Sequence, residues 1–485
     1  MDRKNFIRHI GFGGISLAAL PLLSMQKKSL NKRPNILYIL TDQQTASALS
    51  CAGNPYVNTP GMDKIALMGV RFENCYATQP LCGPNRTCMF TGLLPHQTGA
   101  ITNLGPETNK IGNHPMLGRL LSDGGYRTAL FGKWHIASDD ENKSQHGFEE
   151  IWCGQIPKIK DFDDQVAERT IQFMNKNDDR PFFAVASFIN PHNICEMARG
   201  NMNKELNFPN YDMSRYPDVN ECPPLPVNFE IPKDEPEELR NILDSKQNEK
   251  VYPTKNWSET EWRQYLWAYY RMVEHVDNST LKIIDSLEKK RLLENTIIIF
   301  SSDHGEGCGA HHWNQKQVFY EKVLNIPLIV AWKGITIPES KNQNLVSNGL
   351  DLFPTICDFA SVNLPGKYFG KSLKKIILEG EEVEKKEYIV SETSFADNDT
   401  LLGLSGRCLR SNKFKYIVYS KGDIREQLFD MEIDPGERNN LSVNAKYIQI
   451  LNDHRKMLKK WCIKTKDDYN CINENPFENF NRFVQ

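Results

Sequence analysis

The chain has 485 residues, of which 40% are hydrophobic and 25% are charged, and its formal net charge is −2. This length allows a large domain and a smaller one, and the composition is that of an ordinary globular protein. The balanced charge gives no reason to expect binding to nucleic acid or to a charged membrane surface. We therefore expect no nucleic-acid partner.

The first 30 residues predict a targeting segment. Arg3, Lys4 and Arg8 precede an apolar run over residues 10–23. This run is short for a membrane span and is typical of a signal sequence, although a membrane-tethering helix is the alternative. No long apolar run follows residue 30, so we expect an exported protein, periplasmic or extracellular, with no membrane span after maturation.

Four short apolar runs end abruptly in polar residues. Continuous apolar runs of this length are typical of strands that are buried on both faces. The runs are residues 35–40, 126–131, 182–188 and 296–300. Segments that read as helices lie between or after them, at residues 61–70, 116–125 and 271–293. This alternation predicts an α/β fold with a mostly parallel central sheet flanked by helices.

The pattern changes twice further along the chain. Residues 193–250 are polar and rich in proline, which predicts an irregular excursion that shapes a substrate pocket. From about residue 371, short strands alternate with polar turns before a final helix, which predicts a small antiparallel sheet. We therefore expect a targeting segment at 1–30, a catalytic domain at 31–370 and a C-terminal subdomain at 371–485.

Polar and charged residues follow the predicted strands at their carboxyl ends. Ligands of open α/β sheets bind at that edge. The residues found there are Asp42, Lys133, His135, His192, Asp303 and His304. We therefore expect these side chains to converge on one site.

Asp42, Asp303 and His304 favour a site for a hard divalent cation, Ca²⁺ or Mg²⁺, to which Gln43 adds an amide oxygen. The alternative is that the two aspartates only cap the turn or helix that follows each strand.

The cations near the same edge favour an anion site. They are Arg86, Lys133, His135, His192 and Lys316. Taken singly, each could be a solvated or core side chain. Together with the two aspartates, they supply what a tetrahedral anion such as phosphate or sulfate needs when it binds beside a divalent cation.

Cys82 lies in the stretch "CGPNRTCMFTG" and has three interpretations. It is a buried apolar cysteine, a thiolate nucleophile activated by nearby cations, or the precursor of another nucleophile. The stretch resembles the Cys-x-Pro-x-Arg signature, followed by Thr-Gly, of the type I sulfatases in the alkaline-phosphatase-like superfamily. In that family the cysteine is oxidised to formylglycine, which favours the third interpretation.

Five further segments resemble the same family and occur in the same order. They are "RPNILYILTDQQ", "GYRTALFGKWH", "FINPH", "SSDHGEGCGAHHWNQK" and "LFDMEIDPGERNNL". The resemblance runs from about Arg33 to about Leu441, and it implies an alkaline-phosphatase/sulfatase-like fold.

The resemblance also implies roles for the residues of the site. Asp42, Gln43, Asp303 and His304, with the modified Cys82, would surround a divalent cation, with Ca²⁺ expected in preference to Mg²⁺. At the second position the family commonly has Asp, and at the fourth it often has Asn. With fewer anionic ligands, this site should hold its cation less tightly.

The remaining roles concern the nucleophile and the sulfate. By resemblance, Arg86 and Lys133 hold the formylglycine, and His135 assists removal of a proton from its hydrate. His192 and Lys316 face the sulfate and the leaving oxygen. A formylglycine-generating enzyme is the partner implied for maturation.

The expected reaction is hydrolysis of a sulfate ester, or of a sulfamate, on a sulfated carbohydrate. The resemblance suggests a glycosaminoglycan-derived sugar. His311, His312 and Trp313 are candidates for contact with the sugar ring, with packing of their loop as the alternative. Two other functions remain open: a phosphodiesterase or phosphonate monoester hydrolase of the same superfamily, and a non-catalytic glycan-binding protein.

Overall fold

The computed structural model describes residues 33–469, except 104–110, 113, 137–142, 154–160, 200–216, 381–384 and 398–399. The predicted targeting segment at 1–30 lies outside the described residues. From Pro34 onward the described residues form one compact unit, so the boundary expected at residue 370 stays a prediction. In the described ranges, no helix combines the length and apolar character that a bilayer crossing requires.

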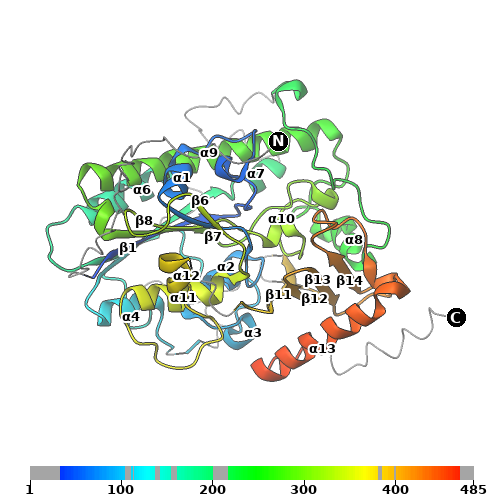
Figure 1. Ribbon diagram of the computed structural model, residues 1–485. Coiled ribbons are helices and arrows are strands. Elements are labelled where there is room, and N and C mark those ends of the chain that lie inside the picture. The colour runs from blue at the N-terminus through cyan, green and yellow to red at the C-terminus, as the bar shows by residue number, and fades with distance from the viewer. Residues whose placement is uncertain are drawn as a thin grey trace, which may run out of the picture. The chain divides into compact units, whose positions relative to one another are not determined.

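The larger sheet has eight strands and is mostly parallel, as the sequence predicts (Figure 1). The first five strands in its order run parallel to one another, whereas β8 pairs antiparallel with both β7 and β2. In spatial order the strands are β5 (Glu150–Trp152), β4 (Arg127–Gly132), β6 (Phe182–Pro191), β1 (Asn35–Asp42), β7 (Thr296–Ser302), β8 (Leu328–Trp332), β2 (Gly69–Phe72) and β9 (Ser340–Asn342).

Helices cover both faces of this sheet, and β1 shows why. Leu37 and Ile39 pack into the core on one face, whereas Ile36, Tyr38 and Leu40 pack into the core on the other. All five are fully buried, as the continuous apolar run predicts for a strand between two layers. The first layer contains α1 (Pro60–Met68), α6 (Phe162–Met174), α7 (Ile194–Ala198) and α9 (Glu259–Lys289). The second contains α2 (Cys82–Thr91), α4 (Leu117–Asp123), α11 (Asn348–Phe359) and α12 (Lys374–Glu379).

Helix α9 begins well before the helix predicted at 271–293. Ser258 caps its first turn and Glu261 bonds back to the Ser258 backbone, a capping box that starts the helix at residue 259. The strand predicted at 35–40 corresponds to β1, and the helices predicted at 61–70 and 116–125 correspond to α1 and α4.

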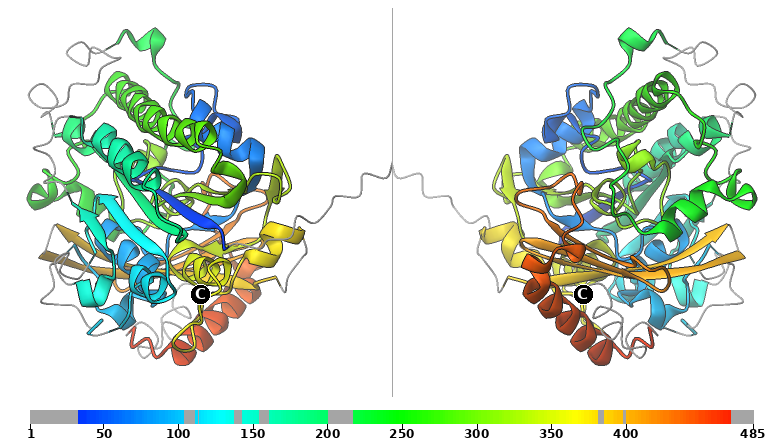
Figure 2. Two further views of the ribbon diagram at one scale, coloured as in Figure 1. Left: turned by 90° about the vertical axis from the view of Figure 1, so that its left-hand side faces the viewer. Right: turned by 90° about the vertical axis from the view of Figure 1, so that its right-hand side faces the viewer.

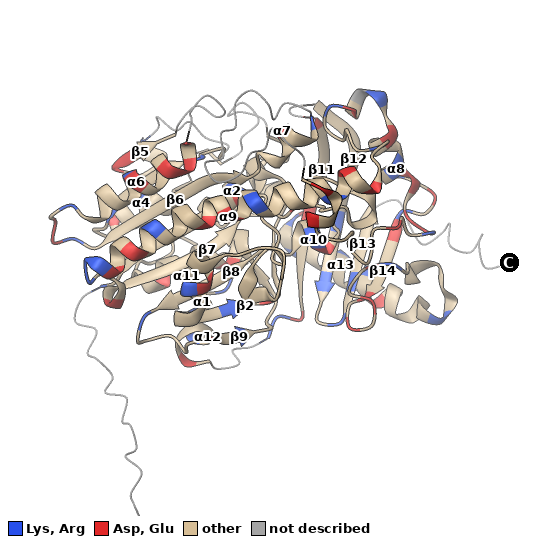
Figure 3. Ribbon diagram, turned by 90° about the horizontal axis from the view of Figure 1, so that it is seen from above, with Lys and Arg blue, Asp and Glu red and all other residues tan. Residues whose placement is uncertain are grey.

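The smaller sheet is antiparallel and C-terminal, as predicted. Helix α13 (Ile448–Thr465) packs on one of its faces (Figure 2), and α8 (Glu237–Asp244) and α10 (Glu321–Leu324) pack on the other. Its strands, in spatial order, are β11 (Tyr388–Asp397), β12 (Thr400–Ser411), β13 (Phe414–Tyr419) and β14 (Glu426–Asp430). A two-stranded parallel sheet pairs β3 (Cys75–Tyr76) with β10 (Val346–Ser347), and α3 (Pro95–Thr98) and α5 (Lys143–His146) are short connecting helices. Basic and acidic residues are mixed along the face that carries α9 (Figure 3).

A buried ion network joins α3 to the C-terminal elements. The two ring nitrogens of His96 lie 2.8 Å from Glu392 Oε1 and 3.1 Å from the Thr465 carbonyl oxygen. Both partners are acceptors, so only the protonated imidazole satisfies both contacts. Burial acts against that charge, but the hydrogen bond and charge of Glu392 outweigh it and raise the pKa of His96. Asp467 lies close enough to share a cation with His96 and Glu392, but Arg407 already pairs with both carboxylates.

Gly132 ends β4 immediately before Lys133. Its φ is +112°, and a Cβ there would lie 1.8 Å from the Ser187 carbonyl oxygen on β6. Gly132→Ala should therefore lower the free energy of unfolding by at least about 3 kcal/mol through strain and overpacking. Gly334→Ala is the matched control, because Gly334 also has a positive φ, +78°, but open space around it. It should cost about 1 kcal/mol. Equal losses in chemical denaturation would contradict this account of the β4 end.

Loss of the His96 proton should weaken the fold. A histidine whose pKa is raised by folding stabilises the protein fully below its ordinary pKa of 6.5, and this contribution disappears as the pH rises through the higher folded value. The melting temperature of His96→Asn should therefore fall furthest below that of the parent at acidic pH, and the gap should narrow towards pH 9. For the control His454→Asn, the opposite trend is expected, because burial lowers the pKa of His454.

Candidate active site

Residue 82 is the first residue of helix α2, and its side chain is fully buried. Leu81 before it is extended, and Pro84 occupies the first turn, where its missing N–H costs nothing. The Gly83 N–H donates to Asn103 Oδ1 at 3.0 Å, which fixes the entry to the helix. The helix N-terminus therefore presents partial positive charge beside the Cys82 side chain.

Asp42 and Asp303 end neighbouring strands of the large sheet. β1 and β7 pair in parallel with Thr41 opposite Ser302, so the two aspartates leave the sheet side by side. Neither carboxylate is exposed to solvent. Arg86 donates from Nε to Asp303 Oδ2 at 2.7 Å and from Nη2 to Asp42 Oδ2 at 3.2 Å. This guanidinium neutralises a pair of buried charges that would otherwise repel.

The pKa values of the two carboxyl groups move in opposite directions. Burial raises the pKa of Asp303, and the charge of Asp42 adds to that effect. Burial and the Cys82 charge also act to raise the pKa of Asp42, but Lys133, His192 and Arg86 prevail and lower it. Lys133 Nζ lies 2.5 Å from Asp42 Oδ2.

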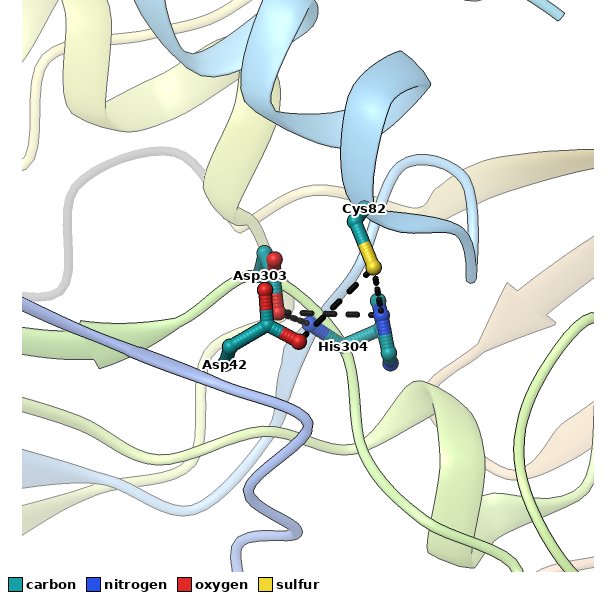
Figure 4. Close-up of side chains that lie close together, drawn as sticks. All are labelled: Asp42, Cys82, Asp303 and His304. Carbon is teal, nitrogen blue, oxygen red and sulfur yellow. Dashed lines mark hydrogen bonds and ion pairs between the residues drawn. The ribbon is translucent and has the colours of Figure 1, made fainter. Parts of the chain in front are cut away.

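Four side chains can offer ligand atoms to one cation. Asp42, Cys82, Asp303 and His304 each place one such atom within 4.8 Å of all the others (Figure 4). The Nδ1 atom of His304 faces the Gly305 carbonyl at 2.9 Å, which leaves Nε2 directed at the site, 3.1 Å from Cys82 Sγ. Two carboxylates and an imidazole next to position 82 fit a divalent cation.

The resemblance implies that the side-chain amide of Gln43 faces the cation, but in the structure the amide contacts Glu306 and Lys316. Its Nε2 donates to Glu306 Oε2 at 2.5 Å, and its Oε1 accepts from Lys316 Nζ at 3.1 Å. Its contact with a metal ion therefore stays a prediction.

The cations expected from the sequence surround Cys82. Lys316 Nζ lies 2.9 Å from Cys82 Sγ, and the side chains of His135 and His192 hydrogen-bond to the same thiol. Burial opposes the thiolate, but Lys133, Lys316 and His304 lower the pKa of Cys82 well below its ordinary value.

His192 and Lys316 carry different charges at neutral pH. Burial and the charges of Lys133 and Lys316 lower the pKa of His192 to about 4, so this imidazole is neutral. Burial acts against the Lys316 charge, but Cys82 and its other anionic neighbours raise the pKa of Lys316, which stays an ammonium. The site therefore pairs a fixed cation with a neutral imidazole that can accept a proton.

Arg86 also bonds to the residue after β4 and to a residue on β6. Besides the two aspartates, it donates from Nη1 to the Lys133 carbonyl at 2.9 Å and to Ser187 Oγ at 2.8 Å. Four of its five N–H groups are used in these bonds. The contact with a modified residue 82 that the resemblance implies stays a prediction.

A cavity of about 660 Å³ opens beside these residues. Lys133, His135, His192 and Lys316 line it, and so does Arg199, the residue that follows α7. The C-terminal sheet reaches it through the end of β11. Its lining also includes Asn103, Gln315, Gln317, Ala396 and Asp397.

Three residues expected to touch the sugar pack against neighbouring side chains, and His312 is only half-buried. Trp313 is fully buried, and its indole N–H donates to the Lys316 carbonyl at 3.2 Å. The ring of His311 lies 4.1 Å from that of Tyr320, and the ring of His312 lies 4.0 Å from that of Phe229. None of the three lines the cavity. These contacts favour loop packing, the alternative interpretation, and the contact with a sugar stays a prediction.

The sequence analysis did not identify two residues of the site, Asn85 and Glu306. Asn85 lies in the first turn of α2, and its Nδ2 donates to the Asp303 carbonyl. Its Oδ1 accepts from the Thr78 N–H at 3.0 Å. Glu306 lies behind Gln43. Both stand inside the quoted motifs, but no spacing rule distinguishes them from their neighbours.

Comparisons with known proteins agree with this geometry. The family model for sulfatases matches residues 34–362, and that for the C-terminal part of N-sulphoglucosamine sulphohydrolase matches residues 309–464. The Δ4,5-hexuronate-2-O-sulfatase of Bacteroides thetaiotaomicron is 30% identical over 464 residues, which cover 91% of each protein.

Two solved structures extend the comparison. A 2-O GAG sulfatase has a TM-score of 0.78 at 30% identity, over 91% of this chain and 94% of that chain. A protein solved in complex with its substrate D-glucosamine-2-N,6-O-disulfate has a TM-score of 0.70 at 26% identity, over 90% of this chain and 99% of that chain.

Addition of a divalent cation should stabilise the folded protein. A cation that binds only the folded state adds about 2.7 kcal/mol when its concentration is 100 times its Kd. After chelation, added Ca²⁺ should raise the melting temperature of the parent, and Asp303→Asn should lose this rise. The control Asp351→Asn should keep it, because this buried aspartate binds the Ser347 and Lys371 N–H groups instead. A rise that persists in Asp303→Asn would contradict the metal site.

Proposed function

The chain belongs to the sulfatase family and is a sulfuric ester hydrolase, and from this premise we propose that it desulfates a sugar derived from a glycosaminoglycan. The bond cleaved is a sulfate ester or a sulfamate. The single observation that carries the proposal is the position of Cys82, buried between the carboxylate pair and the Lys316 ammonium. Support for the sugar comes from the cavity beside it and from the relatives, whose names specify hexuronate and glucosamine sulfates.

The proposal includes two groups that complete the site. Residue 82 acts as formylglycine, made from Cys82 by a formylglycine-generating enzyme, and Asp42, Asp303 and His304 hold Ca²⁺, with Gln43 as the further ligand implied by resemblance. As formylglycine, residue 82 would supply a hydroxyl nucleophile for sulfur, and the cation would supply positive charge for the sulfate oxygens. Mg²⁺ is the alternative ion, and a metal titration would separate the two.

The chain's own residues bind the sulfate and move protons. Lys316, whose Nζ donates to Gln43 Oε1, faces the sulfate and stabilises its charge. His135 contacts residue 82 and accepts the proton that its hydroxyl gives up. A bound sulfate raises the pKa of His192 through its negative charge, so His192 can take up a proton and give it to the leaving oxygen. Lys133 and Arg86 hold Asp42 in place during these steps.

The proposal extends to the location of the enzyme. Residues 1–30 act as an export signal, and the protein works in the periplasm or outside the cell, where sulfated polysaccharide fragments are found. Detection of the mature protein in the periplasmic or extracellular fraction, and its loss from that fraction after deletion of residues 1–30, would test this.

Cys82→Ala should abolish turnover of defined sulfated disaccharides, with a loss of at least about 1,000-fold in kcat, because alanine has no side-chain group that can become the nucleophile. Mass spectrometry should show formylglycine at position 82 in the active parent. Cys88→Ala is the matched control, since Cys88 is also buried on α2 but is not grouped with Asp42, Asp303 and His304 as Cys82 is. It should retain most of the activity.

The same assay separates the other functions. A phosphate ester of the same alcohol should turn over more slowly than its sulfate ester; dominant phosphate turnover would favour a phosphodiesterase or phosphonate hydrolase. A glycan-binding protein without catalysis would bind its sugar equally well after Cys82→Ala and would turn over neither ester.

A further inference from the structure

Glu306 is a fully buried carboxylate in the loop after β7, and four donors surround it. On one oxygen, Oε1, it accepts from the Tyr265 hydroxyl at 2.8 Å, the Gln315 N–H at 2.5 Å and the Cys308 N–H at 3.4 Å. The other oxygen, Oε2, accepts from Gln43 Nε2 at 2.5 Å. Oε1 therefore binds the surrounding loop and α9, whereas Oε2 binds only Gln43 among these donors.

The backbone of Gln43 is held firmly in place. Its φ is +70°, its N–H donates to Asp303 Oδ1 at 3.1 Å, and its carbonyl accepts from the Tyr269 hydroxyl at 2.8 Å. What remains to be set is the orientation of the side-chain amide, which has a donor on one side and an acceptor on the other.

Two charges of opposite sign decide that orientation. Glu306 accepts on one side of the amide, and Lys316 donates on the other. An amide turned by 180° would place its NH₂ group against the ammonium and its oxygen against the carboxylate, and both contacts would be lost. Only the orientation observed satisfies both partners.

The amide in turn fixes the ammonium that faces residue 82. Lys316 Nζ lies 3.1 Å from Gln43 Oε1 and 2.9 Å from Cys82 Sγ. We propose that Glu306 is a positioning residue of the sulfatase reaction, which orients the Gln43 amide so that its oxygen holds the Lys316 ammonium beside residue 82. This inference rests on the role given to Lys316 in the proposed function.

The pair also accounts for the amide at position 43, where the family commonly has Asp. A carboxylate at this position would meet the Glu306 carboxylate at hydrogen-bond distance inside the protein, and two such charges repel. Gln43 and Glu306 should therefore depend on each other. A role for Glu306 in folding alone, as the acceptor that closes the loop from Cys308 to Gln315, is the alternative to be excluded.

Glu306→Gln gives a sharp test. Its amide oxygen is expected on the Oε1 side, where three donors lie, so its NH₂ group faces Gln43 Nε2. Two donors then oppose each other, Gln43 turns, and Lys316 loses its support. We expect kcat to fall about 100-fold, as for a misplacement of about 1 Å, with a smaller change in KM.

The double variant Gln43→Glu with Glu306→Gln should restore activity. The new carboxylate accepts from the NH₂ group at position 306 and offers its other oxygen to Lys316. We expect its kcat to be at least about 10-fold above that of Glu306→Gln, whereas Gln43→Glu alone should be impaired by the facing carboxylates. A role in folding alone predicts no such recovery.

Tyr265→Phe is the matched control. It removes one donor from the same carboxylate but leaves the Gln43 contact intact. Its melting temperature should fall about as far as that of Glu306→Gln, while kcat stays within about 3-fold of the parent. If Glu306→Gln does not fold, Gln43→Met should show the same fall in kcat while keeping the rise in melting temperature with Ca²⁺, because it leaves Lys316 without its acceptor but keeps Asp42, Asp303 and His304.

The outcomes separate this inference from the proposed function. Unchanged kcat in Glu306→Gln, equal losses of kcat in Tyr265→Phe and Glu306→Gln, no recovery in the double variant, or unchanged kcat in Gln43→Met would each overturn it. If instead Lys316→Ala and Cys82→Ala turn over sulfated disaccharides at the parent rate, the proposed function itself fails.

Discussion

The structure of the site depends on one guanidinium between two buried carboxylates. Asp42 and Asp303 lie at the ends of adjacent strands, where both are excluded from water, and each would cost several kcal/mol to bury unpaired. Arg86 bonds to both and lies one helical turn after residue 82. The contact that neutralises the carboxylates therefore also sets how deeply α2 enters the sheet edge, and with it the position of the nucleophile.

The two sheets contribute different parts of the cavity. Residues that follow β4 and β6 supply Lys133, His135 and His192 to its lining, and the segment after β7 supplies Lys316, because parallel strands bring their carboxyl ends to one edge. The antiparallel sheet supplies part of the wall through Ala396 and Asp397. His96, paired with Glu392 and Thr465, ties the region that follows α2 to the C-terminal elements. The cavity lining therefore includes a part of the chain that is remote in sequence from residue 82.

The departures from the family pattern are chemically connected. An amide at position 43 removes a negative charge from the cation site, and it also requires a partner that decides which way the amide faces. Glu306 is such a partner, and it returns a carboxylate to the region without placing it among the cation ligands. His304 likewise replaces an amide with an imidazole whose tautomer is set by the Gly305 carbonyl.

The sequence by itself determined the layered fold and most of the chemistry of the site. Buried strands require continuous apolar runs, so residues 35–40 and 296–300 were recognisable, and the polar residues that end them had to meet at one edge. The C-terminal sheet was recognisable from its short strands and polar turns. The motif around Cys82 and five further segments in the same order identified the family, because each segment depends on local sequence alone.

Only the tertiary structure decided where side chains point. Trp313 precedes Lys316 in the chain, yet its ring is buried while the Lys316 ammonium reaches residue 82. The pairing of Gln43 with Glu306 joins positions 263 residues apart. Spacing along the chain reports which residues share a strand end or a helix face, but the direction of a side chain depends on charges and donors brought to it from other elements. That information exists only once the chain is folded.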